Sequence, residues 1–379
     1  MKLKMKALKY HLALGRSIDL EGIDQEAQAR KCPRHVMWQL SQQLGGAVIH
    51  RPEAQPILPI DAMRAKIIGR PEHWALARTL SSQLSSEDLI FCTCEDVGLP
   101  LATLCAAKRE RPKIVVFVHS LDRPRGRLAL KLFPAANQID LFVTNARTQV
   151  NFLRRYLQLP QDRIYMLLEQ TDTTFFTPGP ASPDKRRPMI ASVGLEYRDY
   201  RTLAAVTKGL DIDVKITGFS QDAPTLAKLF PKTLPDNMSR RFYEWPELVQ
   251  LYRDADLVVV NLFDNNATAG ITTMLEAMSC RRPVVITRTK GLIDYLAFPG
   301  TVTSVNPGDQ AGLQQAIIRL LHNPQEAEAQ AQRGYELILN QHNSEHYVKT
   351  LATLLTSVVA ACQLNHPGLQ TKRFPAYTK

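Results

Sequence analysis

The sequence lacks any apolar run that approaches the roughly 20 residues needed to cross a bilayer as a helix. Its first residues, MKLKMKALKYHLALG, are basic and then apolar, but Arg16 and Asp19 interrupt the apolar part too early for a typical signal peptide. We therefore expect a protein that neither spans a membrane nor is exported. The expected location is cytoplasmic, with peripheral attachment to the cytoplasmic membrane face as an alternative.

Cysteines are few and scattered, at positions 32, 92, 94, 105, 280 and 362. A disulfide framework is typical of much smaller secreted chains. Cys92 and Cys94 are separated by one residue, whereas a usual metal-binding or redox pair has two residues between its cysteines. We expect buried thiols in a reducing compartment.

Aromatic residues make up only 7% of a chain whose formal net charge is +11. The basic excess is uneven, because residues 1–183 carry +8 of it. Such a field could attract nucleic acid, an anionic membrane surface or a phosphorylated substrate. No recognised nucleic-acid motif with interleaved aromatics accompanies the basic residues, so we predict no nucleic-acid partner.

The length of 379 residues, of which 45% are hydrophobic, exceeds one ordinary core and suits two domains of roughly 150 to 200 residues. A segment rich in proline and charge, 177–188, separates two compositional blocks and is the best candidate for a boundary. Patterning predicts strands at 7–14, 47–50, 88–93, 113–118, 140–144, 189–193 and 213–217, and helices at 33–44, 98–107, 247–255, 311–321, 325–339 and 345–362. Gly45 and Gly46 favour a helix stop over a phosphate loop.

The most informative stretch, residues 257–286, reads as strand, polar loop, helix and strand. A helix that starts at 270–273 would present free backbone N–H groups and two threonine hydroxyls, which suit an anion such as a diphosphate. Glu276, about one turn further in, could accept hydrogen bonds from a ribose diol. The alternative is that the unit binds nothing and the threonines only cap the helix.

Leu275, Glu276, Ala277, Met278 and the Pro-Val-Val at 283–285 resemble, in order and spacing, the donor-binding signature of the family 4 glycosyltransferases. The resemblance is strong from about 254 to 295 and moderate or weak elsewhere.

Three positions depart from the family pattern. The family's first glutamate is Thr268 here, its Gly-Phe-Gly turn is 269–271, and the glycine two residues before the proline is Arg281. Asp264, in the same loop, is a candidate substitute for the missing glutamate.

Weaker resemblances place further residues. The predicted strand 113–118 delivers His119 at its carboxyl end, as in the family's Val-x-Val-His-like element, where this histidine lies close to the donor sugar. Residues 194–202 resemble a Gly-Arg-x-x-x-x-Lys-Gly element that binds the donor diphosphate. Leu195 replaces its arginine, and Arg198 falls near its lysine. Arginine can bind phosphate in a bidentate manner.

The resemblance implies an α/β fold of two facing Rossmann-like domains, called GT-B, with a C-terminal helix that crosses back to the first domain. The expected divisions are an acceptor-binding domain at 1–180, a nucleotide-sugar-binding domain at 181–345, and a crossover helix with tail at 346–379. The implied activity is retaining hexosyl transfer with no metal or other cofactor required. The expected catalytic residues are His119, Glu276 and Asp264, and the expected donor-binding residues are Gly194, Arg198, Ala269, Gly270, Ile271, Thr272, Thr273 and Glu276.

The expected donor is a UDP-, GDP- or ADP-hexose. The expected acceptor is a lipid or glycolipid at a membrane face, because the first domain is basic and has no membrane span. Polysaccharide precursors and soluble metabolites are alternatives, as is a non-catalytic member that only binds nucleotide sugars.

Two segments of the first half keep two interpretations each. In 122–133, arginines interleaved with leucines predict either a helix that touches a membrane surface or a buried helix with a solvated entry loop. Glu95 and Asp96, at the end of a predicted strand, could be catalytic or could be ordinary N-caps.

Overall fold

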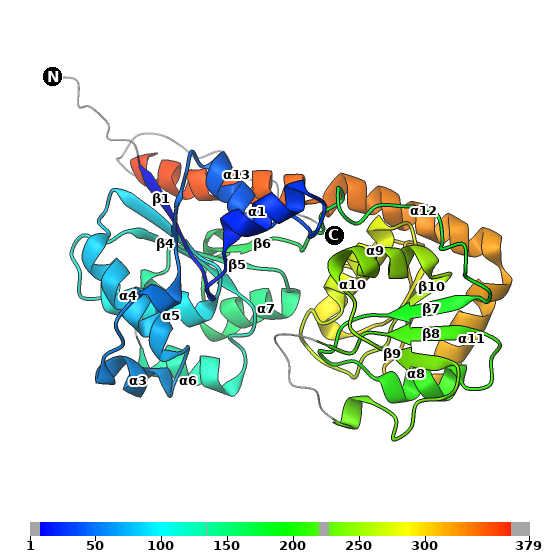
Figure 1. The fold of residues 1–379 in the computed structure, drawn as a ribbon. Helices are drawn as coiled ribbons and strands as arrows, with labels where there is room; N and C mark the ends of the chain where they lie inside the picture. The colour runs from blue at the N-terminus through cyan, green and yellow to red at the C-terminus, as the bar shows by residue number, and fades with distance from the viewer. Residues whose placement is uncertain (1–7, 134, 220–226, 365–379) are drawn as a thin grey trace.

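The computed structural model describes residues 8–133, 135–219 and 227–364, which form two α/β domains (Figure 1). Each domain is built around a six-stranded parallel sheet, with the strand orders β2-β1-β3-β4-β5-β6 and β12-β11-β10-β7-β8-β9. Helices cover both faces of each sheet, so each sheet has two apolar cores. The predicted fold class is confirmed.

The first sheet has its fully apolar strands in the middle, since a parallel sheet covered on both faces buries both sides of its central strands. Its strands are β1 (Lys9–Ala13), β2 (Val48–His50), β3 (Asp88–Cys92), β4 (Lys113–Val118), β5 (Leu141–Thr144) and β6 (Ile164–Met166). The helices are α1 (Leu20–Gln28), α2 (Val36–Gln43), α3 (Pro59–Ala65), α4 (Pro71–Gln83), α5 (Glu95–Cys105), α6 (Pro124–Leu132) and α7 (Arg147–Tyr156), with 3₁₀ turns at Pro52–Ala54, Ala136–Gln138 and Gln161–Arg163.

The second sheet is centred on β7 and β10, whose residues are all buried. Its strands are β7 (Met189–Ser192), β8 (Asp213–Ile216), β9 (Met238–Arg240), β10 (Leu257–Val260), β11 (Val284–Thr287) and β12 (Thr303–Val305). The helices that follow the linking segment are α8 (Tyr200–Thr207), α9 (Trp245–Asp254), α10 (Ile271–Ser279), α11 (Gln310–His322), α12 (Pro324–Gln341) and α13 (Ser344–Leu364), with 3₁₀ turns at Ala227–Leu229 and Lys290–Leu292.

The predicted strands are confirmed with small shifts at their ends, although residue 7 lies outside the described residues. Gly45 and Gly46 have φ of 77° and 88° and end α2, which confirms the helix stop. No element was predicted for α1, α3 or α4, which begin in polar or proline-containing sequence. The helix predicted from Gly98 begins instead at Glu95.

The cysteines of the described residues are free thiols, and most of them are buried, as predicted. The side chain of Cys362 lies outside the described residues. Within the described ranges, no helix is both long and apolar enough to cross a bilayer.

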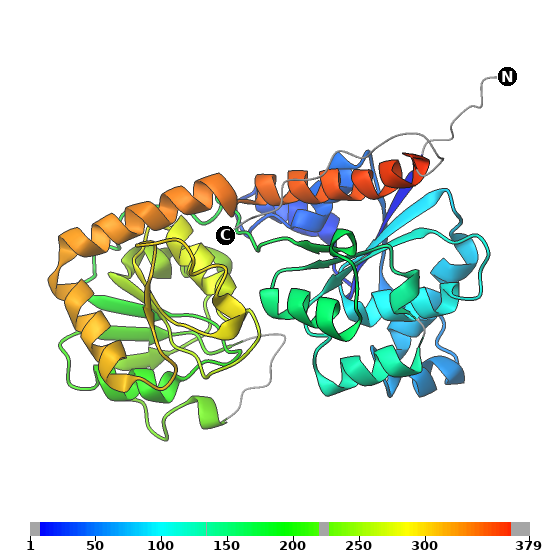
Figure 2. The same ribbon diagram turned by 180° about the vertical axis from the view of Figure 1, so that it is seen from behind.

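Helix α13 crosses back from the second domain and lies along the first, as predicted (Figures 1 and 2). It packs against α2, and its Leu351 and Leu355 are fully buried in the core that also holds Leu12 and Leu40. The tail beyond Leu364, part of the predicted segment 346–379, lies outside the described residues.

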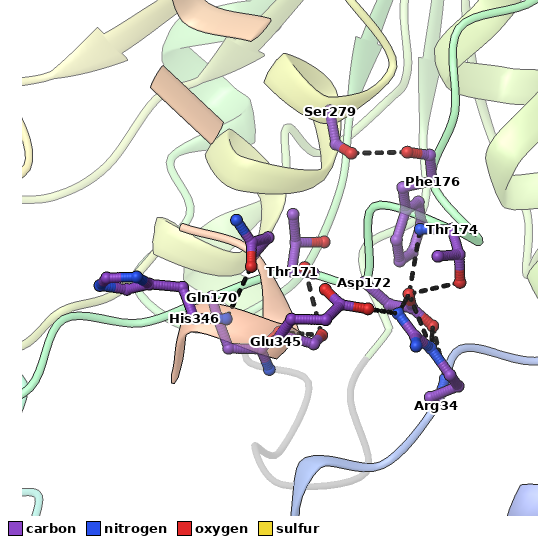
Figure 3. Close-up of polar contacts among 11 residues, drawn as sticks. Arg34, Gln170, Thr171, Asp172, Thr174, Phe176, Ser279, Glu345 and His346 are labelled. Atoms are coloured by element: carbon purple, nitrogen blue, oxygen red, sulfur yellow. Dashed lines mark hydrogen bonds and ion pairs between the residues drawn. The ribbon is translucent and has the colours of Figure 1, made fainter. Parts of the chain in front are cut away.

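The chain passes between the domains twice, and the two passages lie side by side (Figure 3). Thr171, on the outward passage, forms a parallel bridge with Asn343 on the return, and its N–H donates to the carbonyl of His342 at 2.8 Å. Further along, the hydroxyl of Ser279 in α10 donates to the carbonyl of Phe176. We call these two passages, at residues 171–176 and 342–343, the hinge; its bonds join the passages to each other and to α10 of the second domain.

Asp172 is the buried centre of this hinge. Its carboxylate accepts from the backbone N–H of Arg34 at 2.8 Å and from the Arg34 guanidinium at 2.6 Å, and the same guanidinium reaches Glu345 at 2.6 Å (Figure 3). Burial alone would raise the pKa of Asp172, but the hydrogen bonds from Arg34 and Thr174 and the charge of Arg34 together lower it. The first domain, the hinge and α13 thus meet at one cation.

Candidate active site

Two glycines lie where β7 and β10 end, at the carboxyl edge of the second sheet. Gly194 and Gly270 have φ of 94° and 85°, a conformation that favours glycine. A Cβ on Gly194 would lie 2.7 Å from Nη2 of Arg198, and one on Gly270 would lie 3.3 Å from its Nη1. Because β7 and β10 are neighbours, the two turns enclose the Arg198 guanidinium. The structure therefore brings Gly194, Arg198 and Gly270 together.

Arg198 is only 3% exposed. Its Nε donates to the carbonyl of Val193 at 2.8 Å, its Nη1 to that of Glu196 at 3.1 Å, and its Nη2 to the hydroxyl of Thr273 at 2.9 Å. Among the described residues, no carboxylate lies within ion-pair distance of this guanidinium. Burial lowers the pKa of Arg198. A buried cation without a counter-ion is costly, so the site favours an anionic ligand.

Helix α10 begins directly beside this cation, with Gly270 as its N-cap. The N–H of Ile271 donates to the carbonyl of Thr268, so one of the predicted donors is already in use. Within the described part of the chain, no group accepts from the N–H groups of Thr272 or Thr273. Ala269 and Ile271 bury their side chains in the core, which leaves only their backbone to meet a ligand.

Glu276 lies one turn further into α10 and is 5% exposed. The hydroxyl of Tyr252, on α9, donates to its Oε2 at 2.7 Å. Burial raises the pKa of Glu276 to about 7, although the bond from Tyr252 and the charge of Arg198 act against the rise. Tyr252 was not predicted as part of a site, because its spacing with Leu248 and Leu251 is that of ordinary core positions.

The raised pKa of Glu276 predicts that stability falls as pH rises. Its carboxyl holds a proton in the folded state until about pH 7 but loses it near pH 4.5 when unfolded. Between these values the unfolded chain is favoured progressively, by up to about 3 kcal/mol. Urea unfolding of the wild type and of Glu276→Gln at pH 4.5 to 7.5 checks this. The wild type should lose stability more steeply with pH than the variant, and parallel profiles would contradict the expectation.

His119 stands at the carboxyl end of β4 in the first domain. Its side chain is exposed, its ring lies 4.7 Å from that of Phe117, and its Nε2 lies 3.3 Å from the carbonyl of Thr93. The N–H groups of His119 and Ser120 donate to the carboxylate of Glu95 at 3.0 and 2.9 Å. The carboxylate of Glu95 therefore holds the loop after β4 and does not cap α5. The interpretation of Glu95 as an ordinary N-cap is wrong.

Asp264, the candidate substitute for the missing glutamate, is exposed in the loop after β10. The loop is shaped by Asn265, whose Oδ1 accepts from the N–H of Ala267 at 3.0 Å. It is also held by Gly291, where a Cβ would lie 1.9 Å from the Ala267 carbonyl oxygen. The role of Asp264 stays a prediction.

Polar contacts join the two domains beside this loop. Arg147, at the start of α7, pairs with Asp294 at 2.6 Å. The hydroxyl of Tyr295 donates to the carbonyl of Asn145, at the end of β5, and accepts from the N–H of Glu169, both at 3.0 Å. These bonds hold the carboxyl edge of the first sheet against loops of the second domain.

The second domain contains two Asp-x-Asp pairs, which have the spacing of a manganese ligand pair. Arg187 pairs with both Asp211 and Asp213. Asp254 accepts from the N–H of Ser182 at 2.7 Å, and Asp256 from that of Met189 at 2.7 Å. Both pairs thus lie at the amino ends of β8 and β10, away from the carboxyl edge that carries Gly194 and Gly270. Across the described residues, no group of three His, Cys, Asp or Glu side chains could hold a metal ion.

Residues 200–323 match the family model of the glycosyl transferases group 1. No curated protein sequence matches the chain. Among solved structures, sucrose-phosphate synthase from Thermosynechococcus elongatus superposes with a TM-score of 0.69 and 17% identity, over 93% of this chain and 100% of that chain.

Two further solved structures superpose along nearly their whole length. An α,α-trehalose-phosphate synthase (UDP-forming) from Burkholderia vietnamiensis gives a TM-score of 0.69 and 14% identity, over 94% and 100% of the two chains. HepE from Anabaena, in complex with UDP-glucose, gives 0.63 and 14%, over 92% and 99%.

The chain has the GT-B fold of these glycosyltransferases, with its two parallel sheets and crossing helix. The family match covers α8 to α11 and includes the α10 motif. Residues 200–323 are therefore similar in sequence to the glycosyl transferases group 1, and the whole chain shares the fold of the solved structures named above. The recognition made from residues 254–295 is confirmed.

Proposed function

We propose that this protein transfers a hexose from a nucleotide sugar to an acceptor, with retention of anomeric configuration and without a required metal. The observation that carries the donor assignment is Arg198, a buried cation beside the free N–H groups at the start of α10. A diphosphate bound there would supply the negative charge that the described residues do not provide.

Each residue of the proposed donor site has a role. Arg198 and the N–H groups of Thr272 and Thr273 stabilise the charge that develops on the departing diphosphate, which is electrostatic catalysis. Glu276 accepts from the ribose diol, with Tyr252 fixing its orientation. His119 faces the transferred sugar from the first domain, and Asp264 lies in the loop that the family uses to hold it.

The donor is proposed to be a UDP-hexose first, with GDP- and ADP-hexoses as the alternatives. HepE, which has the same fold, was solved with UDP-glucose. The acceptor is proposed to be a lipid or glycolipid, held at the carboxyl edge of the first sheet. The alternative acceptor is a saccharide, either a polysaccharide precursor or a sugar phosphate. Sugar phosphates appear in the names of the two synthases of the same fold.

A panel of UDP-, GDP- and ADP-hexoses tests the donor assignment through the nucleotide that slow hydrolysis releases. We expect release from one donor by the wild type, and a loss of at least about 100-fold in Glu276→Ala. The matched control is Glu336→Ala, which removes an exposed glutamate from α12 and should leave release unchanged.

The thermal midpoint with and without each nucleotide completes this experiment. Stabilisation without turnover, even with lipid and sugar-phosphate acceptors present, would identify a non-catalytic binding protein, which the replacement of the first motif glutamate by Thr268 also allows. The absence of both turnover and stabilisation would overturn the donor site itself.

A further inference from the structure

Two helices at the lower end of the first domain expose apolar side chains. Helices α3 and α6 lie next to each other at the end of this domain opposite α13 (Figures 1 and 2). Nη2 of Arg125, in α6, reaches the carbonyls of Ala65 and Lys66, at the end of α3, at 3.4 and 3.5 Å. The two helices therefore present one continuous surface, which we call the α3/α6 surface.

The exposed side chains follow the helical repeat. In α6, Leu128 and Leu132 are 46% and 55% exposed and lie four residues apart on one face, whereas Gly126 and Ala129 form its buried face. In α3 and the two residues before it, Ile57, Leu58, Ile60 and Met63 are 48%, 41%, 39% and 60% exposed. Large apolar side chains grouped in this way are uncommon on a surface that faces only water.

The same surface carries cations without counter-ions. Lys66, Arg123, Arg125 and Lys131 are exposed, and within the described residues no carboxylate forms an ion pair with them. The one carboxylate inside α3, that of Asp61, is buried and paired with Arg78 at 2.9 Å. Asp122, at the entry to α6, accepts from the amide of Gln149 at 2.6 Å. The amide of Gln149 does not neutralise Asp122, but the exposed cations outnumber this carboxylate, so the charge balance of the surface is positive.

We propose that the α3/α6 surface docks this protein on a bilayer that contains anionic phospholipids. Exposed leucine, isoleucine and methionine side chains among lysines and arginines are the composition of interfacial helices, whose apolar face enters the headgroup region while the cations meet anionic lipid. Of the two interpretations of segment 122–133, this proposal adopts the membrane surface. It identifies α3 as the second contributor, which the sequence did not suggest.

The position of the surface relates it to the candidate acceptor site. Residues 119–123 form the short connection from β4 to α6, so His119 stands a few residues from the start of the docking helix. Docking through α3 and α6 would hold the carboxyl edge of the first sheet near the bilayer, where a lipid acceptor lies. This inference deepens the proposed function and rests on it for the lipid acceptor, but membrane binding itself can be measured without donor or acceptor.

Co-sedimentation with vesicles of phosphatidylcholine containing about one-third phosphatidylglycerol tests the proposal. We expect the full chain to bind these vesicles at low salt, to bind pure phosphatidylcholine at least about ten-fold more weakly, and to be released as salt is raised. The double variant Leu128→Ser, Leu132→Ser and the triple variant Lys66→Ser, Arg123→Ser, Lys131→Ser should each bind at least about ten-fold more weakly.

Matched controls come from the second domain. Leu339→Ser removes a leucine of 45% exposure from α12. The triple variant Arg201→Ser, Lys208→Ser, Lys232→Ser removes three exposed cations. Neither control should change vesicle binding.

Three results would overturn the proposal. They are no binding of the wild type to anionic vesicles, equal binding by the α3/α6 variants, and binding of an oligonucleotide instead through the same cations. Nucleotide release from a donor in the absence of vesicles is measured in parallel. Because it does not depend on docking, a failure of docking and a failure of the donor assignment are distinguishable.

Discussion

Replacing Arg198 by methionine is expected to lower nucleotide release from the donor by about 100-fold or more. Methionine keeps much of the buried volume but removes the charge and both bonds from Arg198, while the carbonyl of Val193 still accepts from the hydroxyl of Thr273. Loss of one preorganised donor to a developing anion typically costs 100- to 1,000-fold in rate. Steady-state kinetics with the responsive donor measure the loss.

Two further variants separate charge from geometry. Arg198→Lys keeps a cation but lacks the planar fork that reaches Val193 and Thr273 together, so we expect partial activity. Arg201→Met changes an exposed arginine of α8 and should behave as the wild type. A folded Arg198→Met protein with full nucleotide release would disprove the proposed role, and circular dichroism with the thermal midpoint establishes whether each variant is folded.

Replacing Asp172 by asparagine is expected to lower the free energy of unfolding by about 3 kcal/mol. The carboxylate is buried and accepts several bonds from Arg34, and its removal leaves the Arg34 guanidinium with only the exposed carboxylate of Glu345 as a partner. Glu345→Gln breaks the ion pair between Arg34 and Glu345. Because the Glu345 side chain is 54% exposed, this change should lower the free energy of unfolding by less than about 1 kcal/mol. Urea unfolding near pH 7 compares the two variants.

The lowered pKa of Asp172 gives this prediction a pH signature. The stabilisation is present above the pKa of an unfolded aspartate and is lost as pH falls through the lower pKa of the folded state. The wild type should therefore lose stability in acid more steeply than Asp172→Asn. Equal losses in Asp172→Asn and Glu345→Gln would show that the hinge does not depend on a buried charge.

The α10 motif could be predicted from sequence because it is local. One continuous segment carries the strand, the glycine turn and the helix, so the spacing places Gly270 at the start of α10 and Glu276 within this helix. Arg281 stands where the family pattern has glycine, but the backbone keeps the conformation of a glycine-capped helix end, because Arg281 has φ of 55°. The N–H of Arg281 donates to the carbonyl of Met278 and that of Arg282 to the carbonyl of Ala277, and these two bonds close α10. The arginine occupies the left-handed position that a glycine would fill more easily.

Features that depend on distant segments could not be predicted. Tyr252 reads as a core residue until α9 and α10 are packed together. The burial of Arg198 depends on the meeting of two loops from neighbouring strands, and the role of Glu95 on the separate chain segment at 119–120. Helix α3 lacks a clear apolar repeat, because it leaves most of its apolar side chains exposed.

The return of α13 to the first domain has a consequence for the order in which the chain folds. The core around Leu12 and Leu40 includes Tyr347, Leu351 and Leu355 from this helix. During synthesis the first domain would therefore emerge from the ribosome with one apolar face uncovered, and it would stay so until the whole second domain had followed. Completion of the first domain is thus coupled to translation of the second, and a chain interrupted between them would expose that face to chaperones and to other nascent chains.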